Sequence, residues 1–322
     1  EKSGFTILEL IFVIIILGII SSIGSTIIVN IYESYVLQRA THRVNLKTEL
    51  AVQQIANYLS YRIQGTTLAR DPNALNDSIN ITDATSDTDR KHTVLEWLGS
   101  DNDSFSARRV PGWNGFCDIA GSNQNILKTP GSSLPTARNI IRNLSNNAVN
   151  LYNNGTPNVA IIFRDSLYTK NPDIPYDAKT CMGMVNANTS CISTVRRPPA
   201  GTPNRNQTLS FVTGALTQKV IIEHYKLAWT AYAIIPFKTD DSGPCAEGES
   251  PCNLKLYYNY QPWDGTRLSA ANYNAISHAT IATNVTVFKF AEFGSTFRIK
   301  LCAQENIGDS NISVCKEKAI VL

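Results

Sequence analysis

Charged residues are scarce in this chain, and near its N-terminal end they are almost absent. Only 17% of the 322 residues are Asp, Glu, Lys or Arg, and the formal net charge is +3. Between Leu10 and Ile31 there is no charged residue at all. A net charge this small gives no argument for nucleic acid as a partner, although it does not exclude one.

Motifs of the common enzyme classes are also missing. The chain contains no GxSxG, HExxH, GxxxxGKS/T or GxGxxG pattern, the signatures of hydrolases, metalloproteases and nucleotide-binding enzymes. It contains no CxxC pair, and its four histidines are scattered, whereas zinc sites usually draw ligands from closely spaced pairs. We therefore predict that the protein is not an enzyme and carries no resident cofactor.

The uncharged stretch has the length of a membrane span. Its 22 residues would form a helix of about 33 Å, and the hydrocarbon core of a bilayer is ~30 Å thick. A secretory signal would have a shorter apolar region of ~7–15 residues followed by a cleavage site. Small residues such as Ser21 and Ser22 imitate such a site, but apolar residues resume at Ile27. The pattern favours a retained transmembrane helix.

Glu9 is the one carboxylate at the membrane end of this helix. A charge inside a spanning helix costs roughly 2.5–3.5 kcal/mol on insertion scales, and no Lys or Arg follows until Arg39. If the chain were cut between Gly4 and Phe5, the new amino group could meet Glu9 of a neighbouring copy. In the alternative, the helix stays uncut and Glu9 reaches the headgroups. Physical reasoning alone leaves both open.

The segment Gly4-Phe5-Thr6-Ile7-Leu8-Glu9-Leu10, with the apolar run that follows it, resembles the N-terminus of type IV pilins and of the pseudopilins of type II secretion. The resemblance implies that a prepilin peptidase cuts after Gly4 and that Phe5 is then N-methylated. It also implies that Glu9 guides docking and neutralises the N-terminus of a neighbouring subunit in a filament. Residues 1–4 would be a leader peptide, and residues 5–31 the transmembrane and filament-core half of the first helix.

The helix is predicted to continue past the membrane as one long spine over residues 32–65. Apolar or small residues recur there at helical spacing. They are Val44, Thr48, Ala51, Ile55, Leu59 and Ile63. Gly65 follows Arg62 closely, and a cation in the last turn with glycine just beyond is a common helix end.

Residues 66–322 are predicted to form a globular periplasmic or extracellular domain. Phe297, Ile299 and Leu301 alternate with Arg298 and Lys300, the pattern of a strand with one buried face. We expect strands over residues 159–163, 208–213, 219–225, 227–237, 254–260, 284–293, 296–301 and 313–322, and exposed loops over residues 71–90 and 196–199. The predicted class is α+β, with the spine helix packed on an antiparallel sheet as in pilins.

All seven cysteines lie outside the membrane segment, where an oxidising compartment would favour disulfides over metal. Proximity in the sequence suggests three pairs. They are Cys181 with Cys191, Cys245 with Cys252, and Cys302 with Cys315. Cys117 is then left over, although it could equally pair with Cys181 or Cys191.

Two weaker motifs follow from short patterns. The string from Asp309 to Ser313 resembles an extended bacterial N-glycosylation acceptor with Asn311 as the acceptor residue. Four carboxylates near Cys245 could hold calcium, since hard oxygen ligands suit that ion, but their spacing is not that of an EF-hand and a solvated acidic turn is the alternative. These residues are Asp240, Asp241, Glu247 and Glu249.

The resemblance and the size of the domain together predict a minor pilin or minor pseudopilin near the tip of a short filament. The chain would be a single-pass inner-membrane protein with a periplasmic C-terminal domain until extracted into a pilus or pseudopilus. Its partners would be other pilins, the prepilin peptidase, the assembly platform and the membrane. Retention of Glu9 argues against the topmost position, because the extreme tip subunit of secretion systems can lack that glutamate.

Two other functions stay open at this stage. One is a pilus-borne adhesin or DNA-binding subunit, with the irregular middle of the chain as its head. The other is a membrane-tethered periplasmic enzyme that shares only the leader. The sequence does not distinguish secretion, twitching, adhesion and DNA uptake, because machines for all four use this N-terminus.

Overall fold

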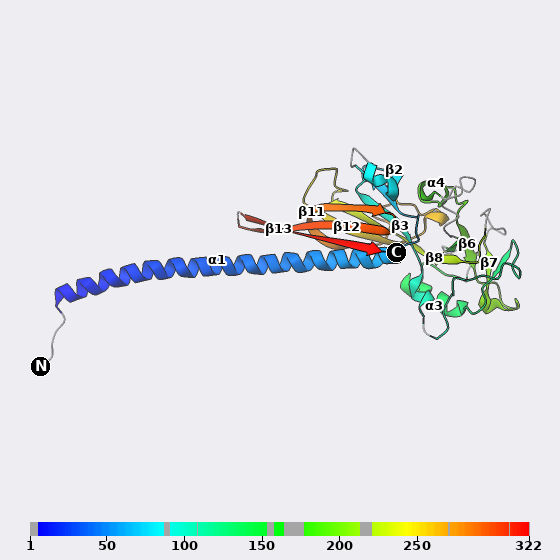
Figure 1. Cartoon of the computed structure of the whole chain (residues 1–322), viewed down its shortest axis with the longest axis horizontal. Helices are drawn as coiled ribbons and strands as arrows, with labels where there is room; N and C mark the ends of the chain where they lie inside the picture. Colours follow the sequence, from blue (N-terminus) through cyan, green and yellow to red (C-terminus); the bar gives the residue numbers. More distant parts are fainter. Residues whose placement is uncertain are drawn as a thin grey trace.

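One long helix leads into two antiparallel sheets in the computed structural model (Figure 1). The structure describes residues 6–86, 91–107, 109–152, 158–163, 177–212, 221–269, 271–308 and 310–321. Helix α1 spans Ile7–Ser60, its N-terminal half projects away from the rest of the chain, and its C-terminal half lies along the larger sheet. The class is therefore α+β with the helix first, as predicted.

The buried face of α1 begins at Ala40 and follows the predicted helical spacing. The buried residues are Ala40, Val44, Thr48, Ala51, Val52, Ile55, Ala56 and Leu59. Steps of three and four residues keep these side chains on one face, and that face packs on the sheet. This half of the helix is held by apolar contact, which is how most helices in proteins gain their stability.

The predicted helix end at Gly65 is wrong, because α1 ends at Ser60. Arg62 instead forms a β-bridge with Gly99, and its side chain is buried against Glu292 with an Nη2–Oε1 distance of 2.9 Å. The backbone N–H of Ile63 donates to the carbonyl of Leu98. Continuing the helix would remove these contacts and leave a buried guanidinium unpaired, which is costly. Tertiary pairing therefore ends the helix before its local stop signal.

The larger sheet has eight strands in the order β13-β12-β11-β10-β9-β3-β1-β2. Their bounds are β1 Leu68–Asp71, β2 Ala74–Asn80, β3 Val94–Gly99, β9 Thr230–Lys238, β10 Cys252–Tyr260, β11 His278–Phe293, β12 Thr296–Ile307 and β13 Ser310–Val321. Phe297, Ile299 and Leu301 are buried, while Arg298 and Lys300 are exposed, which confirms the predicted alternation. The last three strands contact α1.

Residues 71–90 are not simply the predicted loop, because β2 and the 3-10 helix η1 (Ile81–Ser86) lie within them. β2 is an edge strand, and its only buried side chains are Leu75 and Ser78. A strand with two buried positions, one of them polar, has little of the alternation that identifies strands in a sequence. The prediction failed for this reason.

The smaller sheet has five strands in the order β4-β7-β6-β5-β8. Their bounds are β4 Ile126–Lys128, β5 Val159–Phe163, β6 Ser193–Arg196, β7 Thr208–Phe211 and β8 Tyr225–Ala228. Around them lie α2 (Asn102–Phe105), α3 (Leu134–Leu144), α4 (Ala178–Cys181), η2 (Arg205–Gln207) and η3 (Pro262–Asp264). This sheet and α3 lie beyond the C-terminal end of α1 (Figure 1).

The apolar run at residues 227–237 is not the single strand that we expected. It divides at Trp229 into β8 of the smaller sheet and β9 of the larger one. Both pieces are buried, so the run stays apolar through the bend and gives no sign of it. In the predicted strand at 219–225, Tyr225 is the only residue that the structure describes as part of a strand.

Two buried carboxylate residues, Glu96 and Asp101, take part in hydrogen bonds that connect the larger sheet to neighbouring segments. Glu96 on β3 accepts hydrogen bonds from Arg70 on β1 and from Tyr260 Oη at 2.8 Å, and Arg70 Nη2 donates to the carbonyl of Met184 at 3.0 Å. Asp101 follows β3, and its backbone N–H donates to the carbonyl of Leu227 on β8 at 2.8 Å. The first network ties strands of the larger sheet to the segment at Met184, and the second links the end of β3 to β8 of the smaller sheet.

Asp101 generates a prediction about pH. Its carboxylate is buried and accepts hydrogen bonds from Ser104 N and Trp113 Nε1, but burial raises its pKa to about 7. The folded state therefore holds a proton that the unfolded state releases near pH 4, so stability falls as pH rises from ~4 to ~7. The full effect is on the order of 4 kcal/mol.

Asp101→Asn should flatten the dependence of the melting temperature on pH over this range, measured by circular dichroism on the full chain in neutral detergent. The variant keeps one acceptor for Ser104, and Trp113 keeps its second bond, to the carbonyl of Asp101. Glu247→Gln, an exposed carboxylate on another loop, serves as the control. An unchanged pH profile for Asp101→Asn would contradict the assignment.

Candidate functional site

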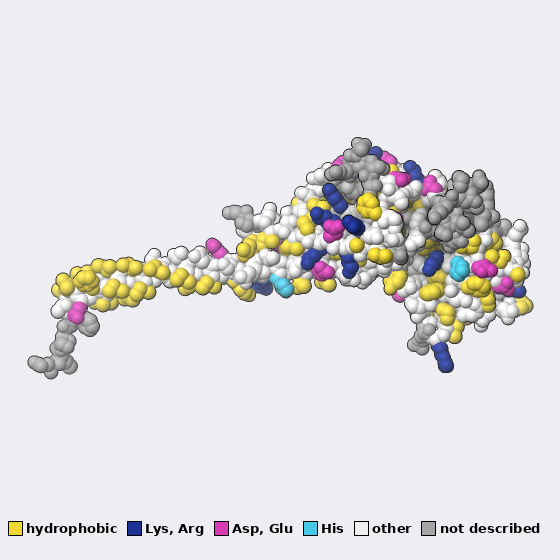
Figure 2. All heavy atoms as spheres, in the orientation of Figure 1, with side chains coloured by type: hydrophobic (Ala, Val, Ile, Leu, Met, Phe, Trp, Pro, Cys, Tyr) yellow, Lys and Arg dark blue, Asp and Glu magenta, His cyan; other side chains and the backbone are white. Residues whose placement is uncertain are grey.

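The N-terminal half of α1 is an apolar stem without protein contacts among the described residues. The large apolar side chains from Ile7 to Leu37 are exposed except Val36, which is partly buried. This is the one described helix long and apolar enough to cross a membrane. Figure 2 shows the apolar surface continuing along the stem, with charged side chains gathered on the head. The stem is consistent with single-pass membrane anchoring.

Glu9 has a local role that the sequence analysis did not consider. Thr6 is the N-cap of α1, and Glu9 is the third helical residue. Thr6 N donates to Glu9 Oε2 at 3.2 Å, and Glu9 N donates to Thr6 Oγ1 at 3.4 Å. This reciprocal capping box satisfies two backbone donors at the helix start. Glu9 remains exposed while it caps the helix.

Gly4 and Phe5, the predicted processing residues, lie outside the described residues. Thr6 is the first described residue, and its extended backbone (φ −80°, ψ 151°) marks the start of the helix. The predicted cut would therefore fall two residues before the helix begins.

The hairpin of β12 and β13 holds the other half of α1 in place. Glu305 accepts a hydrogen bond from Arg43 Nη1 at 2.8 Å and lies 3.9 Å from Lys47 Nζ, and Lys316 pairs with Glu49 at 3.4 Å. Exposed pairs of this kind contribute about 0–1 kcal/mol each. The buried apolar face of the helix therefore supplies most of the stabilisation, and the ion pairs set the alignment.

The structure places each suggested cysteine pair at disulfide distance. Cys181–Cys191, Cys245–Cys252 and Cys302–Cys315 are the three bonds. Cys302 and Cys315 lie directly opposite each other in the β12–β13 hairpin. Cys117 is free and buried, and burial raises the pKa of its thiol to about 11, which keeps it protonated and unreactive.

The four carboxylates considered for calcium do not converge. Asp241 pairs with Lys255 at 3.0 Å, and Glu249 pairs with Lys238 at 3.3 Å. Asp240 accepts a hydrogen bond from Ser242 N at 3.0 Å, inside its own turn. Within the described residues, no group of three or more His, Cys, Asp or Glu side chains could hold a metal ion. The acidic-turn alternative describes these residues better.

Asn311, the suggested glycosylation acceptor, is exposed on β13 and lies opposite Asn306 near the tip of the hairpin. Asp309 lies outside the described residues. The β12–β13 hairpin extends from the head toward the N-terminal half of α1 (Figure 1), so Asn311 lies on the side of the head that faces the stem. Its accessibility is compatible with modification, which stays a prediction.

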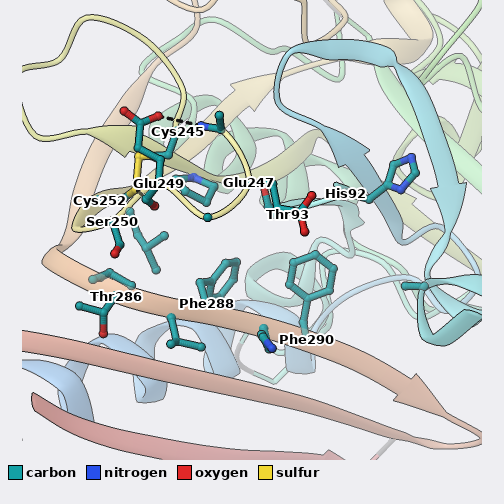
Figure 3. A pocket seen from close by; sticks show the side chains of 18 residues that line it. His92, Thr93, Cys245, Glu247, Glu249, Ser250, Cys252, Thr286, Phe288 and Phe290 are labelled. Carbon is teal, nitrogen blue, oxygen red and sulfur yellow. Dashed lines mark hydrogen bonds between the residues drawn. A yellow bond between two sulfur atoms is a disulfide. The ribbon is translucent and has the colours of Figure 1, made fainter. Parts of the chain in front are cut away.

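A groove of about 530 Å³ lies between the disulfide loop Cys245–Cys252 and β11. Figure 3 shows Phe288 and Phe290 from β11 on one wall, His92 at one end, and Glu249 bound to its own loop. His92 lies 3.4 Å from Asp77. The groove has an apolar wall, and of its charged or titratable groups His92 and Glu249 are engaged with neighbours in the fold.

The division of α1 into a free half and a docked half generates a prediction. Leu59→Ala removes a side chain with 0% exposure and should destabilise the head by about 2–5 kcal/mol. Leu17→Ala, in the exposed half, should leave the melting temperature of the detergent-solubilised chain unchanged. Thermal denaturation followed by circular dichroism checks both. Equal losses would mean that the stem is packed on the head.

No protein-family model, curated protein or solved structure matches this chain. The residues and contacts of the chain itself are therefore the basis for its function. The features that bear on it are the exposed apolar stem, the capped Glu9 and the docked half of α1.

Proposed function

We propose that this chain is a minor pilin or minor pseudopilin, a structural subunit of a type IV pilus or of a type II secretion pseudopilus. A prepilin peptidase cuts it between Gly4 and Phe5 and methylates the new N-terminus. The stem then leaves the inner membrane at the assembly platform and enters the core of a filament. The head stays on the periplasmic or outer side throughout.

This proposal rests on one observation, the division of the continuous helix α1 into an exposed N-terminal half and a C-terminal half that is docked on the larger sheet. The large apolar side chains from Ile7 to Leu37 are exposed except Val36, which is partly buried, and buried side chains recur from Ala40 to Leu59. Leaving a large apolar side chain in water costs roughly 1.5–3 kcal/mol relative to burying it. The stem therefore requires either lipid or other helices around it, and a filament subunit passes from the first environment to the second.

Small residues in the stem support close helix packing in a filament core. Apart from the adjacent residues and the backbone of the helix itself, a Cβ added at Gly18 or Gly24 would meet nothing within 4 Å. Small side chains at an interface allow helix backbones to approach closely. Glycines cost helix stability, and close packing against a neighbour offsets that cost.

The shape of the head supports a position near the tip. The smaller sheet lies beyond the C-terminal end of α1 (Figure 1). In a tightly repeating helical lattice, material beyond the end of the spine would meet the head of the subunit above. A subunit near the tip has few or no neighbours above it. The same feature disfavours the role of a major, repeating subunit.

Processing is the first test. Wild-type protein coexpressed with a prepilin peptidase should begin at a methylated Phe5, and Gly4→Leu should keep the leader. Gly18→Ala, which meets nothing within 4 Å, should be processed normally. Mass spectrometry of the purified protein measures all three. An intact bond between Gly4 and Phe5 in the native protein would remove the basis of the filament proposal.

The charge of Glu9 is the second test. Glu9→Gln keeps an acceptor for the capping box but removes the charge, whereas Glu9→Leu removes both. If the charge meets the N-terminus of a neighbour, both variants should insert in the membrane and both should enter sheared filaments at least ~10-fold less, equivalent to ~1.4 kcal/mol. Immunoblots of filament and membrane fractions measure this.

Glu33→Gln is the matched control, since Glu33 is exposed on the same helix and lies outside the motif. Normal incorporation of Glu9→Gln together with loss of Glu9→Leu would show that the cap alone matters. That result would contradict the proposed pairing between subunits.

A further inference from the structure

Arginines from separate parts of the chain gather around one exposed tyrosine in the head. Arg138 Cζ lies 5.3 Å from the centroid of the Tyr152 ring, and Arg205 Cζ lies 4.7 Å from it. Arg138 comes from α3, Arg205 from η2, and Tyr152 from the segment after α3. Guanidinium groups at this distance from a ring are held by cation–π attraction.

Two more arginines extend the cluster. Arg142 follows Arg138 by one helical turn on α3, so the two share a face. Arg197 follows β6, and its backbone N–H donates to the carbonyl of Leu151, next to Tyr152. We name Arg138, Arg142, Arg197, Arg205 and Tyr152 the arginine cluster. It lies on the smaller sheet side of the head, at the end far from the membrane stem (Figure 1).

The partners of these arginines are all neutral. Arg142 Nε donates to Asn147 Oδ1 at 2.6 Å, and Arg205 Nε donates to the carbonyl of Pro198 at 2.6 Å. Arg197 Nη2 donates to Asn206 Oδ1, and Arg138 Nη1 to Asn139 Oδ1 at 3.4 Å. Across the described ranges, no ion pair joins the cluster to a carboxylate.

Two guanidinium nitrogens in the cluster lack any partner. Arg138 Nε and Arg197 Nε are buried atoms without a hydrogen bond. Burial lowers the pKa of Arg197, and the positive charges of Arg205 and Arg138 lower it further. Elsewhere in the head, the buried Arg62 and Arg70 are each paired with a glutamate. Within the described residues, the cluster therefore holds several cations together without a carboxylate partner.

We propose that the arginine cluster binds the phosphodiester backbone of a nucleic acid. Guanidinium groups present planar pairs of donors that match phosphate oxygens, and the unpartnered Nε atoms supply further donors. Stacked tyrosine and guanidinium faces also suit nucleobases, which anionic polysaccharides do not have. This activity goes beyond filament assembly and does not depend on it.

Fluorescence anisotropy with a labelled single-stranded DNA of about 30 nucleotides tests the proposal, on the full chain in neutral detergent. Changing Arg138, Arg197 and Arg205 together to Gln should raise Kd at least ~10-fold at moderate salt. It should also lower the slope of log K against log salt by about 2, since each phosphate contact on a single strand contributes ~0.7. Tyr152→Leu should weaken binding, and Tyr152→Phe should not.

The matched control changes three exposed cations on β11 and β12 to Gln, namely Lys289, Arg298 and Lys300. It removes the same amount of positive charge as the triple Gln variant of the cluster. Equal weakening by this control, absence of DNA binding by the wild type, or tighter binding of a polyuronate of similar length would each overturn the proposal. If the triple Gln variant melts early, the corresponding triple Lys variant replaces it. That variant keeps the charge and should lose affinity several-fold, and unchanged affinity would overturn the proposal too.

Discussion

One constraint governs this molecule: a single helix of 54 residues has apolar side chains along its whole length, but the chain covers only the C-terminal half of it. The larger sheet buries the face from Ala40 to Leu59, and ion pairs with the β12–β13 hairpin align the helix on that sheet. The stem has no such cover within the described residues. Its partners must come from outside the chain, and lipid or neighbouring helices are the two that suit it.

The sequence predicted those parts of the fold in which burial repeats at a regular period. The face of α1 that contains Val44 and Ile55 and the alternation of Phe297 with Arg298 are both periodic, and both were found as expected. The helix end at Ser60 was missed, because it depends on Arg62 meeting Glu292, which is 230 residues away in the chain. The bend at Trp229 was missed because burial on both sides of it hides the change of sheet.

The candidate sites show the same dependence on distance along the chain. Glu9 and its cap Thr6 are three residues apart, and the cysteines of each suggested pair are at most 13 residues apart. Such sites can be read from local spacing. The residues of the arginine cluster come from α3, η2 and the segments between them. They are too far apart in the sequence to form a short motif. The formal net charge of the whole chain is only +3, and such a total does not reveal where on the surface the charges gather.

The treatment of charge distinguishes the paired arginines of the head from the arginine cluster, for which we propose a binding role. Where the fold buries a guanidinium for its own stability, it supplies a glutamate, as Arg70 with Glu96 and Arg62 with Glu292 show. An unpaired buried charge is strongly destabilising, so an exception needs another reason to persist. The arginine cluster is partly exposed, which lets water reduce that cost while an anion is absent. A polyanion would replace that water and complete the pairing that the chain leaves open.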